Sequence, residues 1–82
     1  MTDTEKLDHA FRTSLDLGDG VDLPGTAYGQ TEGWDSVAHM QLVVAIETAF
    51  GIMLDTDEVV GMSTYPIARA ILRDGHGLDL DP

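Results

Sequence analysis

Cysteine is absent from this chain of 82 residues. Without cysteine there can be no disulfide bond, no thiolate metal site and no cysteine nucleophile. Long apolar runs are absent as well: no segment approaches the roughly 18 residues of a membrane span, and the first residues lack the basic and apolar parts of a secretory signal. We therefore expect a protein of the cytoplasm that has no membrane segment.

Basic residues are scarce. Four lysines and arginines stand against 15 aspartates and glutamates, which gives a formal net charge of −11 at pH 7. Such a field repels nucleic acid and anionic membranes, and it attracts proteins that carry basic docking patches. It also raises the rate of encounter with such proteins while each complex stays weak. Solubility alone would explain the same acidity, so the charge by itself does not choose between these interpretations.

The motifs of two common binding loops are missing. If Asp19-Gly20 belonged to an EF-hand loop, Leu15 and Leu17 would stand at ligand positions, and leucine cannot bind calcium. A phosphate-binding loop needs Gly-Lys-Ser or Gly-Lys-Thr, and segment 18–33 contains no lysine. We therefore expect neither a metal site nor a nucleotide site.

The clearest positive signal is a helix over 35–50. Asp35 is a good N-cap, because its carboxylate can accept from the first-turn N–H groups, and Gly51 stands where a left-handed residue ends a helix. Ser36 is then the first helical residue, with its hydroxyl at the positive end of the helix. One apolar arc is expected to face the core, and its members are Ala38, Leu42, Val43, Ile46, Ala49 and Phe50.

A second apolar stripe lies on the opposite side of this helix. Val37, Met40 and Val44 fall on the side that also holds Ser36 and Glu47. A helix on the surface of a small domain should be polar there. Either the helix is enclosed nearly all round, or the stripe serves something other than the protein's own core.

Three further helices are expected from apolar spacing and end signals, over 3–17, 56–61 and 65–74. The glycine-rich segment 18–33 should form a long loop, with Val21, Leu23 and Tyr28 as its anchors. Residues 75–82 should form a flexible acidic tail. A chain of this length has room for one domain with a small core.

The central helix resembles the signature of acyl carrier proteins. That signature has Asp-Ser-Leu, Glu-Leu-Val, a Leu-Glu pair and Phe-Gly-Ile; this chain has Asp35-Ser36-Val37, Met40, Leu42-Val43, Ile46-Glu47 and Phe50-Gly51-Ile52. In this family the serine carries 4′-phosphopantetheine, and position for position that serine is Ser36. The resemblance covers nearly the whole chain. It implies an all-α fold, a small helical bundle of three longer helices and one short helix, with a long loop between helices one and two.

The resemblance also implies a cofactor and partners. A magnesium-dependent phosphopantetheinyl transferase would move 4′-phosphopantetheine from coenzyme A to Ser36, and acyl groups would travel as thioesters on its terminal thiol. The other partners would be enzymes that load and process acyl groups and that dock through basic patches on a monomeric carrier. The residues expected to contact these partners are Asp35, Val37, Met40, Val44, Glu47, Asp57 and Glu58.

Catalysis by the chain itself is not expected. A serine-hydrolase elbow requires Gly-x-Ser-x-Gly, whereas this chain has Gly33-Trp34-Asp35-Ser36-Val37. His39 points toward the core arc rather than toward Ser36, and no third orienting group is evident. We therefore interpret His39 as a packing histidine and not as a base.

Departures from the family pattern leave the cargo open. Many fatty-acid carriers have acids where this chain has Gln41 and Thr48, Trp34 is bulkier than the usual residue, and Tyr65-Pro66 opens the last helix in an atypical way. Gly-Trp-Asp before the serine favours an acyl carrier over a peptidyl carrier. We expect a discrete carrier for polyketide or other specialised biosynthesis, or for fatty acid synthesis. The alternatives are an aminoacyl or D-alanyl carrier, and an acidic interaction bundle that never carries a cofactor.

Overall fold

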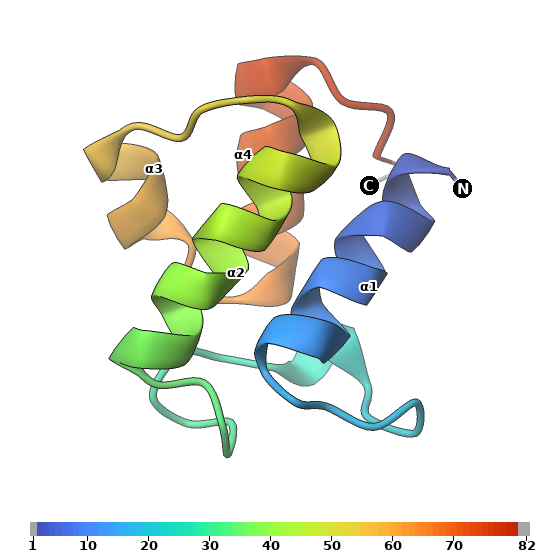
Figure 1. Ribbon diagram of the computed structural model, residues 1–82, viewed down its shortest axis with the longest axis vertical. Helices are drawn as coiled ribbons and strands as arrows, with labels where there is room; N and C mark the ends of the chain where they lie inside the picture. Colours follow the sequence, from blue (N-terminus) through green and yellow to red (C-terminus); the bar gives the residue numbers. More distant parts are fainter. Residues whose placement is uncertain (1, 81–82) are drawn as a thin grey trace.

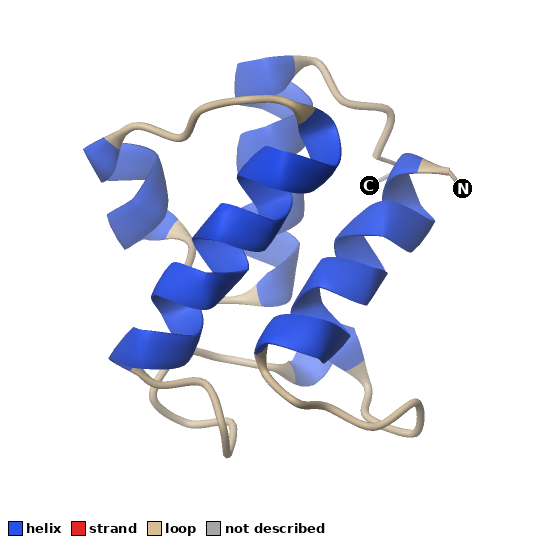
Figure 2. Ribbon diagram, in the orientation of Figure 1, coloured by secondary structure: helices blue, strands red, loops and turns tan. Residues whose placement is uncertain are grey.

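The computed structural model describes residues 2–80, and its regular elements are helices joined by loops (Figures 1 and 2). Within this part of the chain there is no strand, only an isolated bridge between Ala27 and Thr64. The elements in chain order are α1 (Asp3–Ser14), the short 3-10 helix η1 (Leu23–Gly25), α2 (Ser36–Phe50), α3 (Thr56–Gly61) and α4 (Tyr65–His76). The predicted class is therefore confirmed: an all-α bundle of three longer helices and one short helix, with a long loop between the first two.

The core lies where α1, α2 and α4 face one another. Helices α1 and α2 run antiparallel side by side, and α4 passes behind α2 in the view of Figure 1. Every longer helix and the long loop contribute side chains to it. The largest fully buried ones are Leu7, Phe11, Leu15, Trp34, Leu42, Ile46, Met62 and Leu72.

Helix α1 is shorter than predicted. It ends at Ser14 rather than at residue 17, because the chain reverses at Asp16, which has a φ of +54°. Aspartate enters this left-handed region more readily than most residues other than glycine. The reversal turns Leu15 into the core and brings the Leu17 N–H to the Arg12 carbonyl at 2.9 Å.

Helix α2 begins and ends at the predicted residues. The Asp35 carboxylate accepts from the Ala38 N–H at 2.9 Å, and Gly51, with a φ of +64°, donates its N–H to the Glu47 carbonyl. The buried arc is narrower than predicted, since Ala49 is exposed and Phe50 is only half-buried.

The prediction for the end of α4 was wrong. Gly75 lies inside the helix, which runs to His76 and ends at Gly77 in the left-handed conformation. A Cβ at position 75 would lie 3.0 Å from a Glu58 carboxylate oxygen. Gly75 therefore permits the close approach of α3, and the cost of a glycine in a helix is modest.

The described part of the predicted flexible tail, residues 75–80, is packed against the bundle. Leu80 is only 2% exposed, Leu78 is half-buried, and the Asp79 N–H donates to the Asp3 carboxylate at 3.0 Å. Two leucines separated by one residue are enough to hold this short segment against the core. Residues 81–82 of the predicted tail lie outside the described residues.

The predicted anchors of the long loop are confirmed only in part. Leu23 is buried, as predicted, but Val21 is only half-buried and Tyr28 is 43% exposed. The Tyr28 N–H donates to the Ser63 carbonyl at 2.8 Å, which fixes the middle of the loop to the segment before α4. Gly33 has a φ of +90°, and a Cβ there would lie 2.8 Å from the Leu15 carbonyl oxygen, so only glycine fits.

Tyr65 explains the atypical start of α4. Its ring is buried edge-on against Phe11, with the ring centroids 5.0 Å apart, and its hydroxyl donates to the Asp8 carboxylate. Arg69 donates to the same phenol oxygen at 2.9 Å. The side chain thereby ties α4 to α1. Burial raises the pKa of Tyr65, the hydrogen bond to Asp8 raises it further, and Arg69 opposes both effects.

Tyr65 is expected to ionise only at a pH above the ordinary tyrosine pKa of about 10 while the protein is folded. Because the pKa of Tyr65 is raised in the folded protein, its neutral phenol contributes to the free energy of unfolding. That contribution is complete below pH about 10 and is lost as the pH rises through the folded-state pKa. A Tyr28→Phe variant leaves Tyr65 as the single tyrosine. Its phenolate absorbance should appear at a higher pH in buffer than in denaturant, and equal midpoints would contradict this.

Candidate functional site

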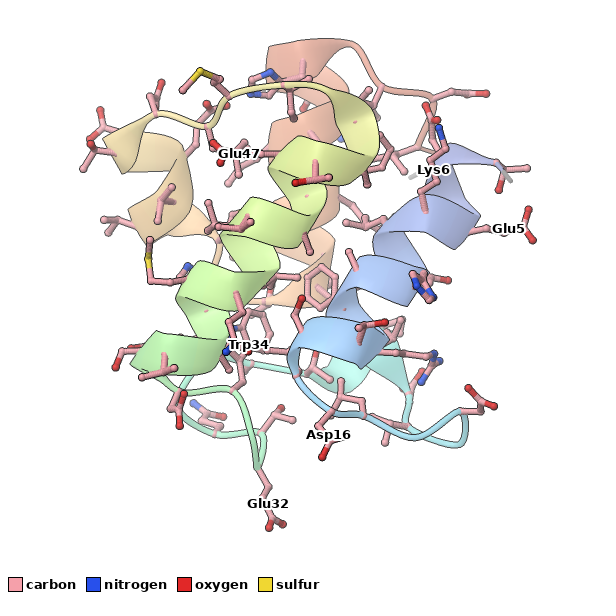
Figure 3. The ribbon with its side chains drawn as sticks, viewed as in Figure 1. Glu5, Lys6, Asp16, Glu32, Trp34 and Glu47 are labelled. Carbon is pink, nitrogen blue, oxygen red and sulfur yellow. The ribbon has the colours of Figure 1, made fainter. Side chains whose placement is uncertain are left out.

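Trp34 places the start of α2. Glu32 points into solvent, whereas Trp34, two residues later, lies beside the first turns of α2 (Figure 3) and is 1% exposed. Its ring meets Phe11 edge-on, with centroids 5.5 Å apart. Trp34, which directly precedes the cap residue Asp35, is therefore fixed in the core. Its fixed position also holds Asp35 and Ser36 in place.

Asp35 and Ser36 stand at the exposed end of α2. Asp35 caps the helix through its carboxylate, and its carbonyl accepts from the His39 N–H at 2.8 Å. Ser36 is the first helical residue and its side chain is exposed. The N–H groups of a first helical turn lack partners within the helix and carry partial positive charge. The Ser36 hydroxyl therefore lies at an exposed position that favours an anionic substituent.

The apolar stripe of α2, defined as Val37, Met40 and Val44, is not covered by the described part of the chain. These side chains are 67%, 53% and 59% exposed. Together with Ser36 and Gln41 they line a shallow groove along the helix. The first of the two alternatives that the sequence left open is thereby excluded, because the described part of the chain does not enclose this side of the helix.

A second hollow opens on the other side of Ser36, toward α3. Its volume is about 320 Å³, and its walls come from α2, α3 and the loops that precede α2 and α4. The lining side chains are mainly apolar: Tyr28, Ser36, His39, Met40, Val59, Val60, Met62 and Ser63. We call this hollow the Ser36 pocket. Sequence reasoning missed Tyr28, Val60 and Ser63 as wall residues, because their approach to Ser36 depends on the fold.

His39 lies in the buried face of α2, as predicted, and both ring nitrogens are engaged away from Ser36. The Trp34 indole N–H donates to Nδ1 at 3.0 Å, and Nε2 lies 2.8 Å from the Val59 carbonyl oxygen. The Trp34 and His39 rings are also stacked, with centroids 6.1 Å apart. The imidazole therefore joins the loop, α2 and α3 rather than facing the serine hydroxyl.

Glu47 has a structural contact within the protein, and its contact with partners stays a prediction. It lies near the other end of α2 (Figure 3), about three turns from Ser36. Its carboxylate accepts from the Leu54 N–H at 2.9 Å, and its carbonyl accepts from the N–H groups of Gly51 and Ile52. Glu47 thus holds the connection between α2 and α3. The predicted placement of Glu47 beside Ser36 is corrected by this geometry.

Replacing Glu47 by alanine or lysine is expected to lower the free energy of unfolding by about 1–2 kcal/mol, because the Leu54 N–H loses its acceptor. Glu47→Gln keeps an acceptor oxygen and should lose less. Urea unfolding of the three variants measures the difference, and equal midpoints for Glu47→Ala and the wild type would show that the contact contributes nothing.

Asp57 and Glu58, the two acids of α3 that are expected to contact partners, differ in exposure. Asp57 is exposed. Glu58 forms a capping box with Asp55, in which each side chain accepts from the other's N–H, and its second oxygen lies 2.8 Å from His76 Nε2. The Asp55-x-x-Glu58 spacing was the available signal for this structural role. Of the four acids predicted to contact partners, Asp35 and Asp57 are exposed, whereas Glu47 and Glu58 are half-buried.

Comparison of the chain with protein-family models, with curated proteins and with solved structures gives no match. Among residues 2–80, no three histidine, aspartate or glutamate side chains are grouped so that they could hold a metal ion. No helix in that part of the chain is both long enough and apolar enough to cross a membrane. Ser36 and the side chains around it are therefore the features of the chain that indicate a function.

Proposed function

We propose that this protein is an acyl carrier that bears 4′-phosphopantetheine on Ser36. The observation that carries the proposal is the position of the hydroxyl: exposed, at the first residue of α2, and between the uncovered apolar stripe and the Ser36 pocket. A phosphodiester on Ser36 would gain about 0.3–1 kcal/mol from the positive end of the helix. The resemblance of residues 35–52 to the acyl-carrier signature supports the same assignment.

The protein's own residues present the group and do not transfer it. A phosphopantetheinyl transferase supplies the chemistry, with coenzyme A as donor and magnesium as its ion. The arm then has two apolar surfaces beside its attachment point, the stripe and the pocket, and a thioester-linked acyl chain is of matching polarity. His39 is not the base, because both of its ring nitrogens are already engaged.

The partners are enzymes with basic docking patches around an apolar centre. The net charge of −11 draws such patches toward the carrier, and two exposed acids, Asp35 next to Ser36 and Asp57 on α3, can pair with them. We propose a cytoplasmic, monomeric carrier for polyketide or other specialised biosynthesis, or for fatty acid synthesis.

The test uses the purified protein with coenzyme A, magnesium and a transferase of broad specificity, followed by intact-mass measurement. The chain has three serines, Ser14, Ser36 and Ser63. Wild type, Ser14→Ala and Ser63→Ala are expected to gain one phosphopantetheine, and Ser36→Ala none. Ser63→Ala is the sharper control because Ser63 is exposed and lines the same pocket. If the wild type gains no mass while a known carrier is modified, the proposal fails.

One alternative has a specific observation in its favour. The uncovered stripe would equally serve an acidic interaction bundle that docks through Met40 and Val44 and carries no cofactor. Absence of modification together with partner binding that is lost in Met40→Glu would favour this alternative. An aminoacyl or D-alanyl carrier differs only in cargo, and loading assays with acyl and aminoacyl donors distinguish the two.

A further inference from the structure

Helix α3 forms one wall of the Ser36 pocket but has no fully buried residue of its own. Two imidazoles from different helices hold it. His39 on α2 reaches the Val59 carbonyl at 2.8 Å, and His76 on α4 reaches the Glu58 carboxylate at 2.8 Å. These two polar contacts position α3 together with the packing of Val59 against the core.

The contacts of His39 define its tautomer. The indole N–H of Trp34 can only donate, so Nδ1 of His39 is the acceptor and carries no proton. The Val59 carbonyl can only accept, so Nε2 of His39 carries the proton and donates it. The two contacts are independent and require the same neutral form, with the proton on Nε2.

The Val59 carbonyl needs a donor from outside its own helix. In a continuing helix the Ser63 N–H would bond to it, but that N–H donates to the Gly61 carbonyl at 2.8 Å because α3 ends at Gly61. His39 supplies the missing donor. The imidazole thus caps the C-terminal end of α3 with a side chain that is held in place by the buried Trp34 ring.

We propose that His39 is a positioning residue of the Ser36 pocket: oriented by Trp34, it caps α3 and thereby sets the distance of the Val59–Val60 wall from Ser36. The positioning is a property of the unmodified protein. The position of α3 would also determine which groups attached to Ser36 fit into the pocket. This consequence rests on the proposed carrier function.

The first measurement needs no variant. Nitrogen NMR of the unmodified wild-type protein at neutral pH reports which imidazole nitrogen carries the proton. His39 is expected to be the Nε2–H tautomer, with the Trp34 indole proton shifted by its hydrogen bond to Nδ1. A His39 ring protonated on Nδ1 would overturn the proposal, because neither contact could then form.

The second measurement separates the contact between Trp34 and His39 from the contact between His39 and Val59. It uses amide hydrogen exchange of α3, read at Val59 and Met62. The shorter His39→Asn side chain keeps an acceptor for Trp34 but does not reach Val59, so exchange should be about tenfold faster, as for one lost hydrogen bond. His39→Gln, which extends its amide farther, should restore much of the protection. Exchange of Ala10 in α1 should not change in either variant.

Unchanged exchange at Val59 and Met62 in His39→Asn would overturn the proposal. If His39→Asn does not fold, the tautomer of the wild type and the exchange rates of His39→Gln still decide. Neither measurement requires Ser36 to be modified. If the tautomer and the exchange rates agree with the prediction but phosphopantetheine transfer fails, the result counts against the carrier function alone.

Discussion

Replacing Trp34 by alanine is expected to lower the free energy of unfolding by about 3–5 kcal/mol, the range for deletion of a large buried aromatic side chain. The ring is 1% exposed, meets Phe11 edge-on and donates to His39. Its removal leaves a cavity at the base of α2 and a buried imidazole nitrogen without its donor. The loss is large for a domain of 82 residues, since native stabilities of small proteins are about 5–15 kcal/mol.

Two companion variants separate packing from hydrogen bonding. Trp34→Phe keeps an aromatic ring against Phe11 but removes the indole N–H, and it should cost about 1–3 kcal/mol. Val37→Ala, at an exposed position of α2, should change the free energy of unfolding by less than about 0.5 kcal/mol. Chemical unfolding of all three variants is followed by circular dichroism. Fluorescence is unsuitable because Trp34 is the single tryptophan and two of the variants remove it. Near-wild-type stability of Trp34→Ala would contradict its place in the core.

Introducing a charge into the apolar stripe of α2 is expected to block partner enzymes without unfolding the protein. Met40→Glu, and separately Val44→Glu, should lower kcat/KM for phosphopantetheine transfer by about 30-fold, which is the roughly 2 kcal/mol typical of a central interface residue. Both side chains are more than half exposed, so the free energy of unfolding should change little. The expected loss arises because a carboxylate must be desolvated in the complex.

Ala49→Glu is the matched control. It adds the same charge to the same helix at an exposed position. Because residue 49 is nine positions after Met40, it lies on the opposite side of α2. Its kcat/KM should stay within about threefold of the wild type, the size of a change in long-range attraction between exposed charges. Equal losses in Ala49→Glu and Met40→Glu would mean that net charge, and not the stripe, controls docking.

Features encoded within a few residues could be predicted from the sequence. Both ends of α2 follow from Asp35 and Gly51, and the second apolar stripe follows from the spacing of Val37, Met40 and Val44. That the stripe is uncovered is seen only in the structure. The bounds of α3 follow from its acidic start and Gly61. Each of these signals lies inside or next to the element that it describes.

Features that depend on distant partners could not be predicted in this way. A glycine at position 75 predicts a helix end, but α4 continues through it, with Glu58 from α3 in the space beside it. Glu47 was placed with Ser36 because of helical angle alone, whereas the chain after Gly51 folds back onto its carboxylate. The link between Trp34 and His39 crosses the start of a helix, where neither helical nor strand periodicity applies.

Fragment-ion sequencing of the modified protein decides whether Ser36 is an attachment point. After incubation with coenzyme A, magnesium and transferase, the added mass should map to Ser36, which is exposed at the first residue of α2. The apolar stripe and pocket beside it should then be perturbed in NMR spectra of the modified protein. Mass located on Ser14 or Ser63, or no mass at all alongside a modified control carrier, would contradict the account.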